Sequence, residues 1–371
     1  MLHRSRRYRS NHRRCTQDER RNRYHRYHFA TTKISDTKEK KVKKTRVFIN
    51  GFGRIGRAAL RIMIEDKTIE IAGINDIYDF EQMAQLFKYD SVYDTYHDSV
   101  KVEDNTLIIG SQHINLHAIK EPSKLLLEDI DVLLQCTGLF LSKEVNTHYL
   151  KNGVKKVLIS APAQNDIPTF IMDVNHQEYR GERIFSNSSC SANAIVPLLA
   201  ILNKAYGVSN ASMSMFHSYT AYQSLLDVKH YSKDIRRSRS ATQNIQPLMS
   251  SAAKETEKFF PHLKEKLYAK SIRVPVSAVT LYDITIKLNK QTDKNAVNKL
   301  FREESYNSFK DMLDITNDFS VSTDFIANKH GAIIDVALTQ VIGEDLLKVF
   351  AWQDNEYGYA YQLVRMVKHI S

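Results

Sequence analysis

Cysteine and tryptophan are scarce in this chain, which contains three cysteines and one tryptophan among 371 residues. So sparse and odd a set of thiols does not make a disulfide framework, and a reducing compartment, by default the cytoplasm, is expected. No apolar run approaches the ~20 residues of a membrane-spanning helix, so no membrane partner is expected. The composition, 42% hydrophobic and 26% charged, is typical of a globular protein with room for two domains.

The net charge of +11 is confined to one end of the chain. Residues 1–46 contain 17 Lys and Arg against 4 Asp and Glu, whereas residues 47–371 contain 36 against 38. The basic segment has no apolar periodicity, and we interpret residues 1–45 as a disordered extension. Three origins are open: a targeting presequence, a nucleic-acid-binding tail, or a start site assigned too far upstream, which we favour. Nucleic acid is an expected partner only if the extension is real.

A glycine-rich segment follows the first apolar strand. Residues 47–50 are predicted to form this strand, and residues 51–56 continue it as G-x-G-x-x-G before a helical pattern. A second strand, residues 69–75, ends at Asp76, and a carboxylate at that spacing accepts hydrogen bonds from adenosine ribose hydroxyls. A structural glycine turn is the alternative. Strand, turn, helix and spaced acid together favour a dinucleotide site, with the pyrophosphate at the helix N-terminus.

Two kinds of sheet are predicted from the order of the elements. Up to about residue 189, strands and helices alternate as in a doubly wound, mainly parallel sheet of the Rossmann type. Beyond it, longer alternating strands predict a mostly antiparallel sheet in an α+β catalytic domain. We therefore expect a nucleotide-binding domain at residues 46–189, completed by a C-terminal helix at 355–371, and a catalytic domain at 190–354.

Cys190 is the candidate nucleophile. It stands between serines and an apolar helical run at residues 195–202, so the thiol is expected at a helix N-terminus, where free N–H groups and the dipole favour a thiolate. A predicted strand at residues 212–220 delivers His217 at its end. The alternatives are an inert buried thiol and a core histidine, and Cys136 is expected in the core.

The sequence resembles the phosphorylating glyceraldehyde-3-phosphate dehydrogenases and their close relatives, the erythrose-4-phosphate dehydrogenases, over about residues 46–371. The resemblance is carried in collinear order by residues 49–57, 87–92, 136–138, 159–163, 186–197, 217–220, 236–239, 273–275 and 354–359. It implies a homotetramer that uses NAD and acts on a small phosphorylated aldehyde and inorganic phosphate.

The resemblance also implies a role for each matching position. Cys190 would attack the aldehyde, His217 would take the hydroxyl proton, and phosphate would cleave the thioester to give 1,3-bisphosphoglycerate. The implied cofactor ligands are Gly51, Gly53, Arg54, Ile55, Gly56, Asp76, Ser160 and Asn355. The implied ligands of substrate and phosphate are Ser189, Ser191, Thr220, Arg237, Ser250, Ser251 and Arg273. No metal is implied.

Some positions depart from the family pattern. Ala221-Tyr222 replaces a common Asn-Asp pair, Ser250-Ser251 replaces Thr-Gly in the phosphate loop, and Gln353 replaces a tyrosine. The altered loop leaves erythrose 4-phosphate open as the substrate, and a divergent paralogue that mainly binds RNA is a further alternative. Asp76 favours NAD, whereas Lys229, where NAD-specific relatives often carry proline, permits NADP.

Overall fold

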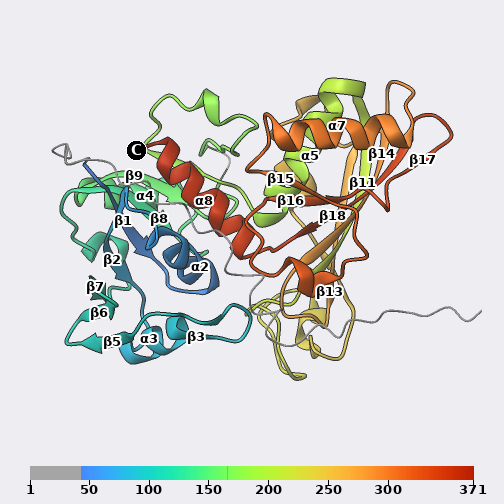
Figure 1. The fold of residues 1–371 in the computed structure, drawn as a ribbon. Coiled ribbons are helices and arrows are strands. Elements are labelled where there is room, and N and C mark those ends of the chain that lie inside the picture. The colour runs from blue at the N-terminus through green and yellow to red at the C-terminus, as the bar shows by residue number, and fades with distance from the viewer. Residues whose placement is uncertain (1–42, 165) are drawn as a thin grey trace, which may run out of the picture. The chain divides into compact units, whose positions relative to one another are not determined.

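Two eight-stranded sheets organise residues 43–371, which the computed structural model describes apart from residue 165 (Figure 1). The extension expected at residues 1–45 lies outside the described residues except for residues 43–45. The structure therefore tests none of its three candidate origins.

The first sheet is mainly parallel, as predicted. In spatial order it comprises β10 (Ile184–Ser186), β9 (Val154–Ile159), β8 (Ile130–Gln135), β1 (Thr45–Asn50), β2 (Ile69–Asn75), β7 (Gln112–His117), β6 (Thr106–Ile109) and β5 (Val100–Glu103). All pairs from β10 to β7 are parallel, and the pairs β7–β6 and β6–β5 are antiparallel.

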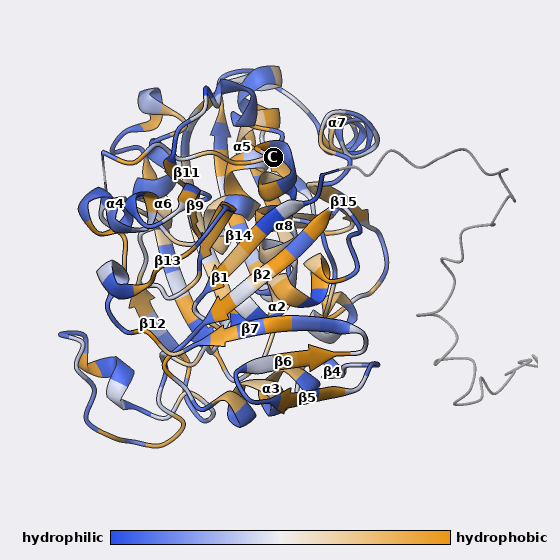
Figure 2. Cartoon of the chain, turned by 90° about the vertical axis from the view of Figure 1, so that its left-hand side faces the viewer, coloured by the Kyte–Doolittle hydropathy of each residue, from blue (hydrophilic) through white to orange (hydrophobic). Residues whose placement is uncertain are grey.

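Short apolar runs explain the central strands of this sheet. Val132, Leu133 and Leu134 in β8 are fully buried, as are Val157, Leu158 and Ile159 in β9. Consecutive buried residues are typical of a parallel sheet that is covered on both faces. In Figure 2, β1 and β2 contain hydrophobic stretches too, and each of these strands ends in a buried asparagine, Asn50 or Asn75.

Helices and short pieces complete the first half of the described chain. They are α2 (Arg54–Met63), α3 (Phe80–Lys88), α4 (Lys143–Lys151), the hairpin of β3 (Tyr89–Asp90) and β4 (Asp94–Thr95), and the short 3-10 turns Pro122–Lys124 and His176–Glu178. Because β1 lies between β2 and β8, the strand order reverses there. The carboxyl ends of β1 and β8 therefore form the switch point at which doubly wound sheets bind ligands.

The second sheet is mostly antiparallel. Its strands in spatial order are β12 (Gln246–Met249), β13 (Leu267–Val274), β11 (Val208–Ser218), β14 (Thr280–Leu288), β18 (Leu346–Gln353), β16 (Ala332–Asp335) and β15 (Leu313–Thr316), with β17 (Gln340–Ile342) paired to β18. The pairs β11–β13 and β15–β16 are parallel and the others antiparallel. The prediction of a mainly parallel and a mostly antiparallel sheet is therefore confirmed.

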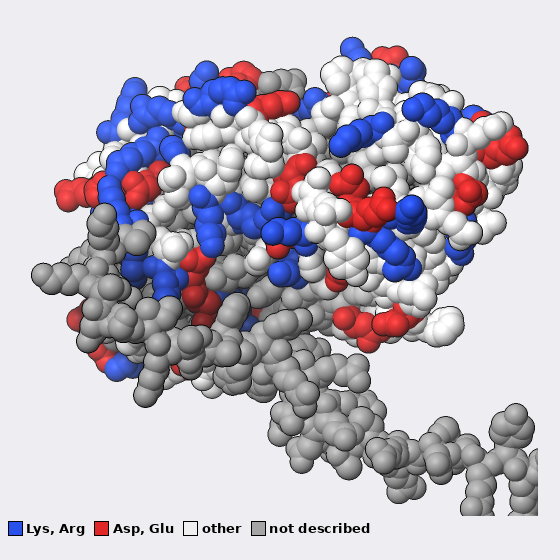
Figure 3. Space-filling model, turned by 45° about the horizontal axis from the view of Figure 1, so that its top comes forward, with Lys and Arg blue, Asp and Glu red and all other residues white. Residues whose placement is uncertain are grey.

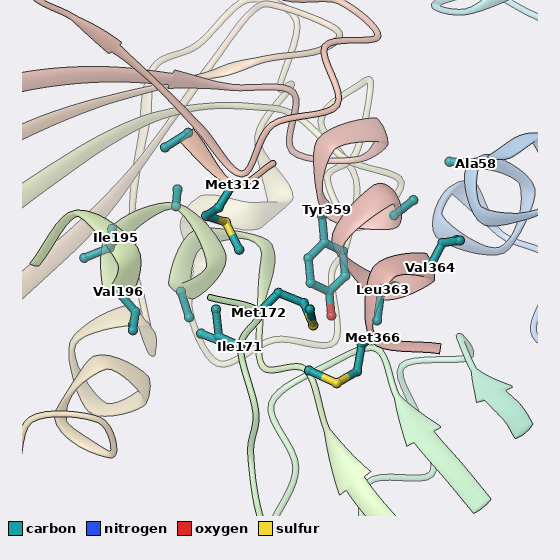
Figure 4. Close-up of a cluster of buried hydrophobic side chains, with 14 of the residues drawn as sticks. Ala58, Ile171, Met172, Ile195, Val196, Met312, Tyr359, Leu363, Val364 and Met366 are labelled. Carbon is teal, nitrogen blue, oxygen red and sulfur yellow. The ribbon is translucent and has the colours of Figure 1, made fainter. Parts of the chain in front are cut away.

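Helices α5 (Cys190–Tyr206), α6 (Ala252–Glu257), α7 (Lys294–Tyr306) and α8 (Tyr357–His369) belong to the second half, with the 3-10 turns Ile235–Ser238, Pro261–Leu263 and Ser322–Phe325. The last helix, α8, packs against α2 of the first half. Figure 4 shows Tyr359, Leu363 and Met366 of α8 in one apolar cluster with Ile195 of α5. The end of the chain thus joins both halves.

The surface of the described residues mixes both signs of charge. Lysine and arginine alternate with aspartate and glutamate over the face shown in Figure 3. Within residues 43–371, no helix is long and apolar enough to cross a membrane. The same residues contain no group of three or more His, Cys, Asp or Glu that could hold a metal ion.

Candidate active site

Cys190 is the first residue of α5, so the predicted helix N-terminus is confirmed. Ser189 caps the helix, because its Oγ accepts a hydrogen bond from the Ala192 amide at 3.1 Å. Ser188, one residue earlier, has φ of 58°, a left-handed conformation that few residues other than glycine adopt. This tight turn from β10 into α5 places the thiol at the positive end of the helix.

His217 faces the thiol from the end of β11. Its Nε2 lies 3.9 Å from the Sγ of Cys190, and the ring is buried, with 4% of the residue exposed. The two residues are far enough apart in sequence that only the fold brings them together. The structure therefore pairs the candidate nucleophile with the candidate base.

Arg273 lies beside His217 because β11 and β13 pair in register, with His217 opposite Arg273. The Nη1 of Arg273 is 2.5 Å from His217 Nδ1 and donates to the Ser218 carbonyl at 2.8 Å. The same carbonyl lies 2.7 Å from Nδ1. A guanidinium only donates, so an Arg273 bond to Nδ1 keeps the ring proton on Nε2. When Nδ1 instead donates to Ser218, Nε2 is free to accept a proton from Cys190.

The surroundings shift the pKa values of both residues. Burial, helped by the charge of Arg273, lowers the pKa of His217 to about 3, so the ring is neutral at neutral pH. Burial raises the pKa of Cys190, and the charge of Arg273 and hydrogen bonds from Ser191 only partly oppose it. The loss of hydration thus works against the thiolate expected at the helix terminus, and the reactivity of Cys190 stays a prediction. The site holds a thiol next to a neutral base.

The glycine loop after β1 fits a pyrophosphate group. Gly51 has φ of 97°, and a Cβ there would lie 2.6 Å from the Thr137 amide nitrogen. A Cβ at Gly56 would lie 2.2 Å from the Gly51 carbonyl oxygen, whereas one at Gly53 would meet nothing within 4 Å. Gly53 precedes α2 at the N-cap position and has no side chain to cap it, which leaves backbone N–H groups at the helix N-terminus as donors. The loop is therefore closely packed at Gly51 and Gly56, and it has open space next to Gly53.

Asp76 connects the end of β2 to this loop. Its Oδ2 accepts from the Phe52 amide at 2.5 Å and its Oδ1 from the Ile77 amide at 2.7 Å. A carboxylate can accept further hydrogen bonds, so the ribose hydroxyls of a dinucleotide fit here. At the carboxyl ends of the neighbouring strands, the Oγ of Ser160 donates to the Gln135 carbonyl at 2.9 Å.

Arg54 and Ile55 form the first turn of α2, but the Arg54 guanidinium is already engaged in ion pairs. It contacts Asp90 at 2.5 Å and Glu356 at 2.6 Å. Arg54 therefore offers a cofactor its backbone rather than its side chain. Asn355, next to Glu356, accepts from the Ser218 Oγ through its Oδ1 at 3.0 Å, which leaves its NH₂ group as a donor toward a bound cofactor.

The predicted phosphate ligands are brought together only in part. Burial and the nearby charge of Arg237 lower the pKa of Arg273 to about 10, and a thiolate at Cys190 would oppose them. The guanidinium of Arg237 stands over the ring of Tyr222, 5.0 Å from its centre. The amide and Oγ of Thr220 both donate to Gln223 Oε1, at 2.9 and 3.0 Å.

Ser250 and Ser251 lie at the start of α6. The Oγ of Ser250 accepts from the Ala252 amide at 3.1 Å, and Ser251 occupies the N-cap position but makes no capping hydrogen bond with its side chain. Among the described residues, no hydrogen bond joins either serine to Cys190, His217 or Arg273. Ser191, in contrast, follows Cys190 directly and is buried. Lys229 is exposed on the segment between β11 and β12.

Two residues at the site were not selected from the sequence. Gln353 Nε2 donates to the Cys190 carbonyl at 3.0 Å, and the Tyr282 hydroxyl donates to Gln353 Oε1 at 2.7 Å. The sequence marked Gln353 only as a departure. A usable signal was its place on the buried side of an alternating strand, since a buried amide requires partners.

The open glycine loop and the spaced carboxylate define a dinucleotide-binding protein, and a thiol paired with a histidine in the same fold is consistent with a nicotinamide-dependent dehydrogenase. Two family models match the chain: the NAD binding domain of glyceraldehyde 3-phosphate dehydrogenase over residues 45–143 and the C-terminal domain of the same enzyme over residues 189–355. The chain belongs to the glyceraldehyde-3-phosphate dehydrogenase family. The predicted family and the predicted cofactor, NAD, are therefore confirmed.

Curated relatives match along nearly their whole length. Glyceraldehyde-3-phosphate dehydrogenase 2 of Bacillus subtilis is 36% identical over 332 residues, which cover 88% of this chain and 97% of that protein. Glyceraldehyde-3-phosphate dehydrogenase of Helicobacter pylori is 38% identical over 333 residues, which cover 87% and 98%. The enzyme of the same name from Chlamydia muridarum is 37% identical over 330 residues, 88% of this chain and 98% of that protein.

Proposed function

We propose that this chain oxidises and phosphorylates glyceraldehyde 3-phosphate with NAD to give 1,3-bisphosphoglycerate. The observation that carries the proposal is the 3.9 Å approach of Cys190 Sγ to a buried, neutral His217, in the same fold as an open dinucleotide loop. The names of the relatives supply the substrate.

In the first step, Cys190 Sγ bonds to the aldehyde carbon while His217 Nε2 takes the thiol proton and returns it to the new oxyanion. The product is a hemithioacetal. NAD, when bound, would supply the acceptor for the hydride of the hemithioacetal carbon. His217 takes the hydroxyl proton as the C=O bond re-forms, so a thioester remains on Cys190. Gln353 holds the Cys190 carbonyl, which keeps the nucleophile in place.

In the second step, an oxygen of inorganic phosphate attacks the thioester carbon and the C–S bond breaks. Cys190 leaves as a thiolate, which recovers a proton from His217, and the proton of the phosphate is released to solvent. We assign the phosphate of the substrate to Arg273 and Thr220, and the attacking phosphate to Arg237 with Ser191. The charge of Arg237 helps to lower the pKa of Arg273, and this supports the assignment because an anion bound between the two cations relieves their repulsion.

The remaining assignments of cofactor and phosphate ligands are part of the same proposal. The loop glycines, Asp76, Ser160 and the free amide of Asn355 would hold NAD. Ser189, Ser250 and Ser251 would assist the attacking phosphate through backbone N–H groups. The boundaries of the two domains, at about residues 190 and 355, are also proposed on this basis.

Erythrose 4-phosphate is the second candidate substrate, because Ser250-Ser251 replaces the usual Thr-Gly of the phosphate loop. The test is NADH formation with each aldehyde, with and without inorganic phosphate, in wild type and Cys190→Ser. Turnover of glyceraldehyde 3-phosphate that requires phosphate and is lost in Cys190→Ser supports the proposal. Phosphate-independent turnover of erythrose 4-phosphate would favour the alternative. No turnover of either aldehyde would favour a binding protein.

We also propose that the chain forms a homotetramer in the cytoplasm. Large apolar side chains are exposed along residues 225–249, namely Leu225, Leu226, Val228, Tyr231, Ile235, Ile245 and Met249. A patch of this kind on a single chain is typical of a surface that another subunit covers. Lys229 lies in the same segment, where a lysine could meet the 2′-phosphate of NADP, so we propose weak NADP activity beside NAD.

A further inference from the structure

Ser188 is a buried residue held in a costly conformation two positions before the nucleophile. Its φ of 58° is left-handed, and the residue is fully buried. A serine keeps such a conformation only when its surroundings bind it firmly. The direction in which the chain leaves Ser188 sets the first turn of α5, and hence the place of the Cys190 thiol.

Three different elements bind the three polar groups of Ser188. Its amide donates to Ser186 Oγ in β10 at 2.8 Å, and its carbonyl accepts from the Tyr359 hydroxyl of α8 at 2.7 Å. Its side-chain Oγ donates to Glu255 Oε2 in α6 at 3.0 Å. The first two bonds fix the backbone on either side, and the third fixes the residue to a helix far along the chain.

Glu255 is a buried carboxylate that forms an ion pair. Only 6% of the residue is exposed, and its other contact is the Lys258 ammonium, 3.0 Å from Oε1. An ionised acceptor makes a stronger hydrogen bond than a neutral one, and Lys258 balances the buried charge. A buried charge that bonds a strained serine is poorly explained as general packing.

We propose that Glu255 is a positioning residue that acts through Ser188 to hold the Cys190 thiol against His217. Because both residues are buried, the pair is assigned an action on the turn and no contact with substrate or cofactor. The proposal rests on the proposed function only in taking Cys190 as the nucleophile.

Two variants at Ser188 separate positioning from stability. Ser188→Ala removes the hydroxyl and keeps the unfavourable φ, whereas Ser188→Gly removes the hydroxyl and relieves the strain. We expect both to slow iodoacetamide alkylation of Cys190 and to lower kcat by about tenfold, the effect of losing one hydrogen bond to a charged group. The KM for the aldehyde should stay within twofold. Ser188→Gly should keep or raise the melting temperature.

Glu255→Gln tests the bond itself, because its amide oxygen still accepts from Ser188. Alkylation and kcat should stay within about threefold of wild type, so the conservative variant rescues what Glu255→Ala loses. The matched control is Glu257→Ala on the same helix, where the carboxylate accepts only from the Glu265 amide at 3.1 Å among the described contacts. This control should leave the alkylation rate unchanged.

The outcomes are distinguishable from those of the proposed function. Alkylation requires no substrate, so a slow Ser188→Gly variant supports positioning even if wild type turns over neither aldehyde. If iodoacetamide alkylates Cys190 at the wild-type rate in both Ser188→Gly and Glu255→Ala, the Ser188–Glu255 hydrogen bond is only structural and the proposal is wrong. Equal slowing in Glu257→Ala would also overturn it, because the effect would then belong to α6 as a whole.

Discussion

Arg273→Met removes a positive charge beside His217 and keeps most of the side-chain volume. Sγ to Nε2 is 3.9 Å and Nδ1 to Nη1 is 2.5 Å. With the imidazole ring between them, the guanidinium lies no more than about 9 Å from the thiol, where a charge at an effective dielectric constant of about 20 is worth about 2 kcal/mol. The pKa of Cys190 should therefore rise by about 1.3, and alkylation at neutral pH should slow about 20-fold.

The assay is the rate constant of Cys190 alkylation by iodoacetamide between neutral and alkaline pH, followed on the Cys190 peptide by mass spectrometry. Arg273→Lys is the matched control, because it keeps the charge and changes the hydrogen bonding. We expect the Met profile to move to higher pH and the Lys profile to stay near wild type. Equal slowing in both variants, or no slowing in Arg273→Met, would refute the electrostatic reasoning.

Three further predictions concern acid stability, cofactor choice and assembly. Since the pKa of His217 is about 3 when folded and 6.5 when free, the unfolded chain binds the extra proton as pH falls from 6.5 toward 3. The free energy of unfolding measured with urea should thus fall by about 3 kcal/mol between pH 7 and pH 4, and it should fall by less in His217→Gln. Asp76→Ala should raise kcat/KM for NADP relative to NAD about tenfold, whereas Lys229→Pro should lower NADP turnover alone; unchanged ratios would contradict both roles. Leu226→Asp should shift the mass measured by light scattering to smaller species, and an unchanged mass would place the interface elsewhere.

The parts of the site that depend on local sequence were predictable. The spacing from Gly51 to Asp76 predicted the strand, glycine turn, helix and second strand that the structure contains. Serines before an apolar run predicted that Cys190 begins a helix. The predicted core of that helix, residues 195–202, was shorter than the observed Cys190–Tyr206, which includes a buried Pro197 and ends at Gly207 with φ of 70°.

The contacts between distant residues were not predictable from local patterns. Arg273 reaches His217 through strand register, and Glu255 reaches Ser188 through the packing of two helices. Neither spacing nor periodicity encodes such pairs. The pKa of Cys190 depends on the fold for a related reason: a sequence shows a helix terminus but not how completely the fold removes water from the thiol.

Helix α8 contains nearly the last residues of the chain, yet it packs against α2 and its Tyr359 hydroxyl bonds the carbonyl of Ser188. Because α8 contacts α2 of the first half and α5 of the second, either half without this helix would leave an apolar face uncovered. The glycine loop and the nucleophile turn are therefore expected to unfold as one cooperative unit rather than as two separate ones.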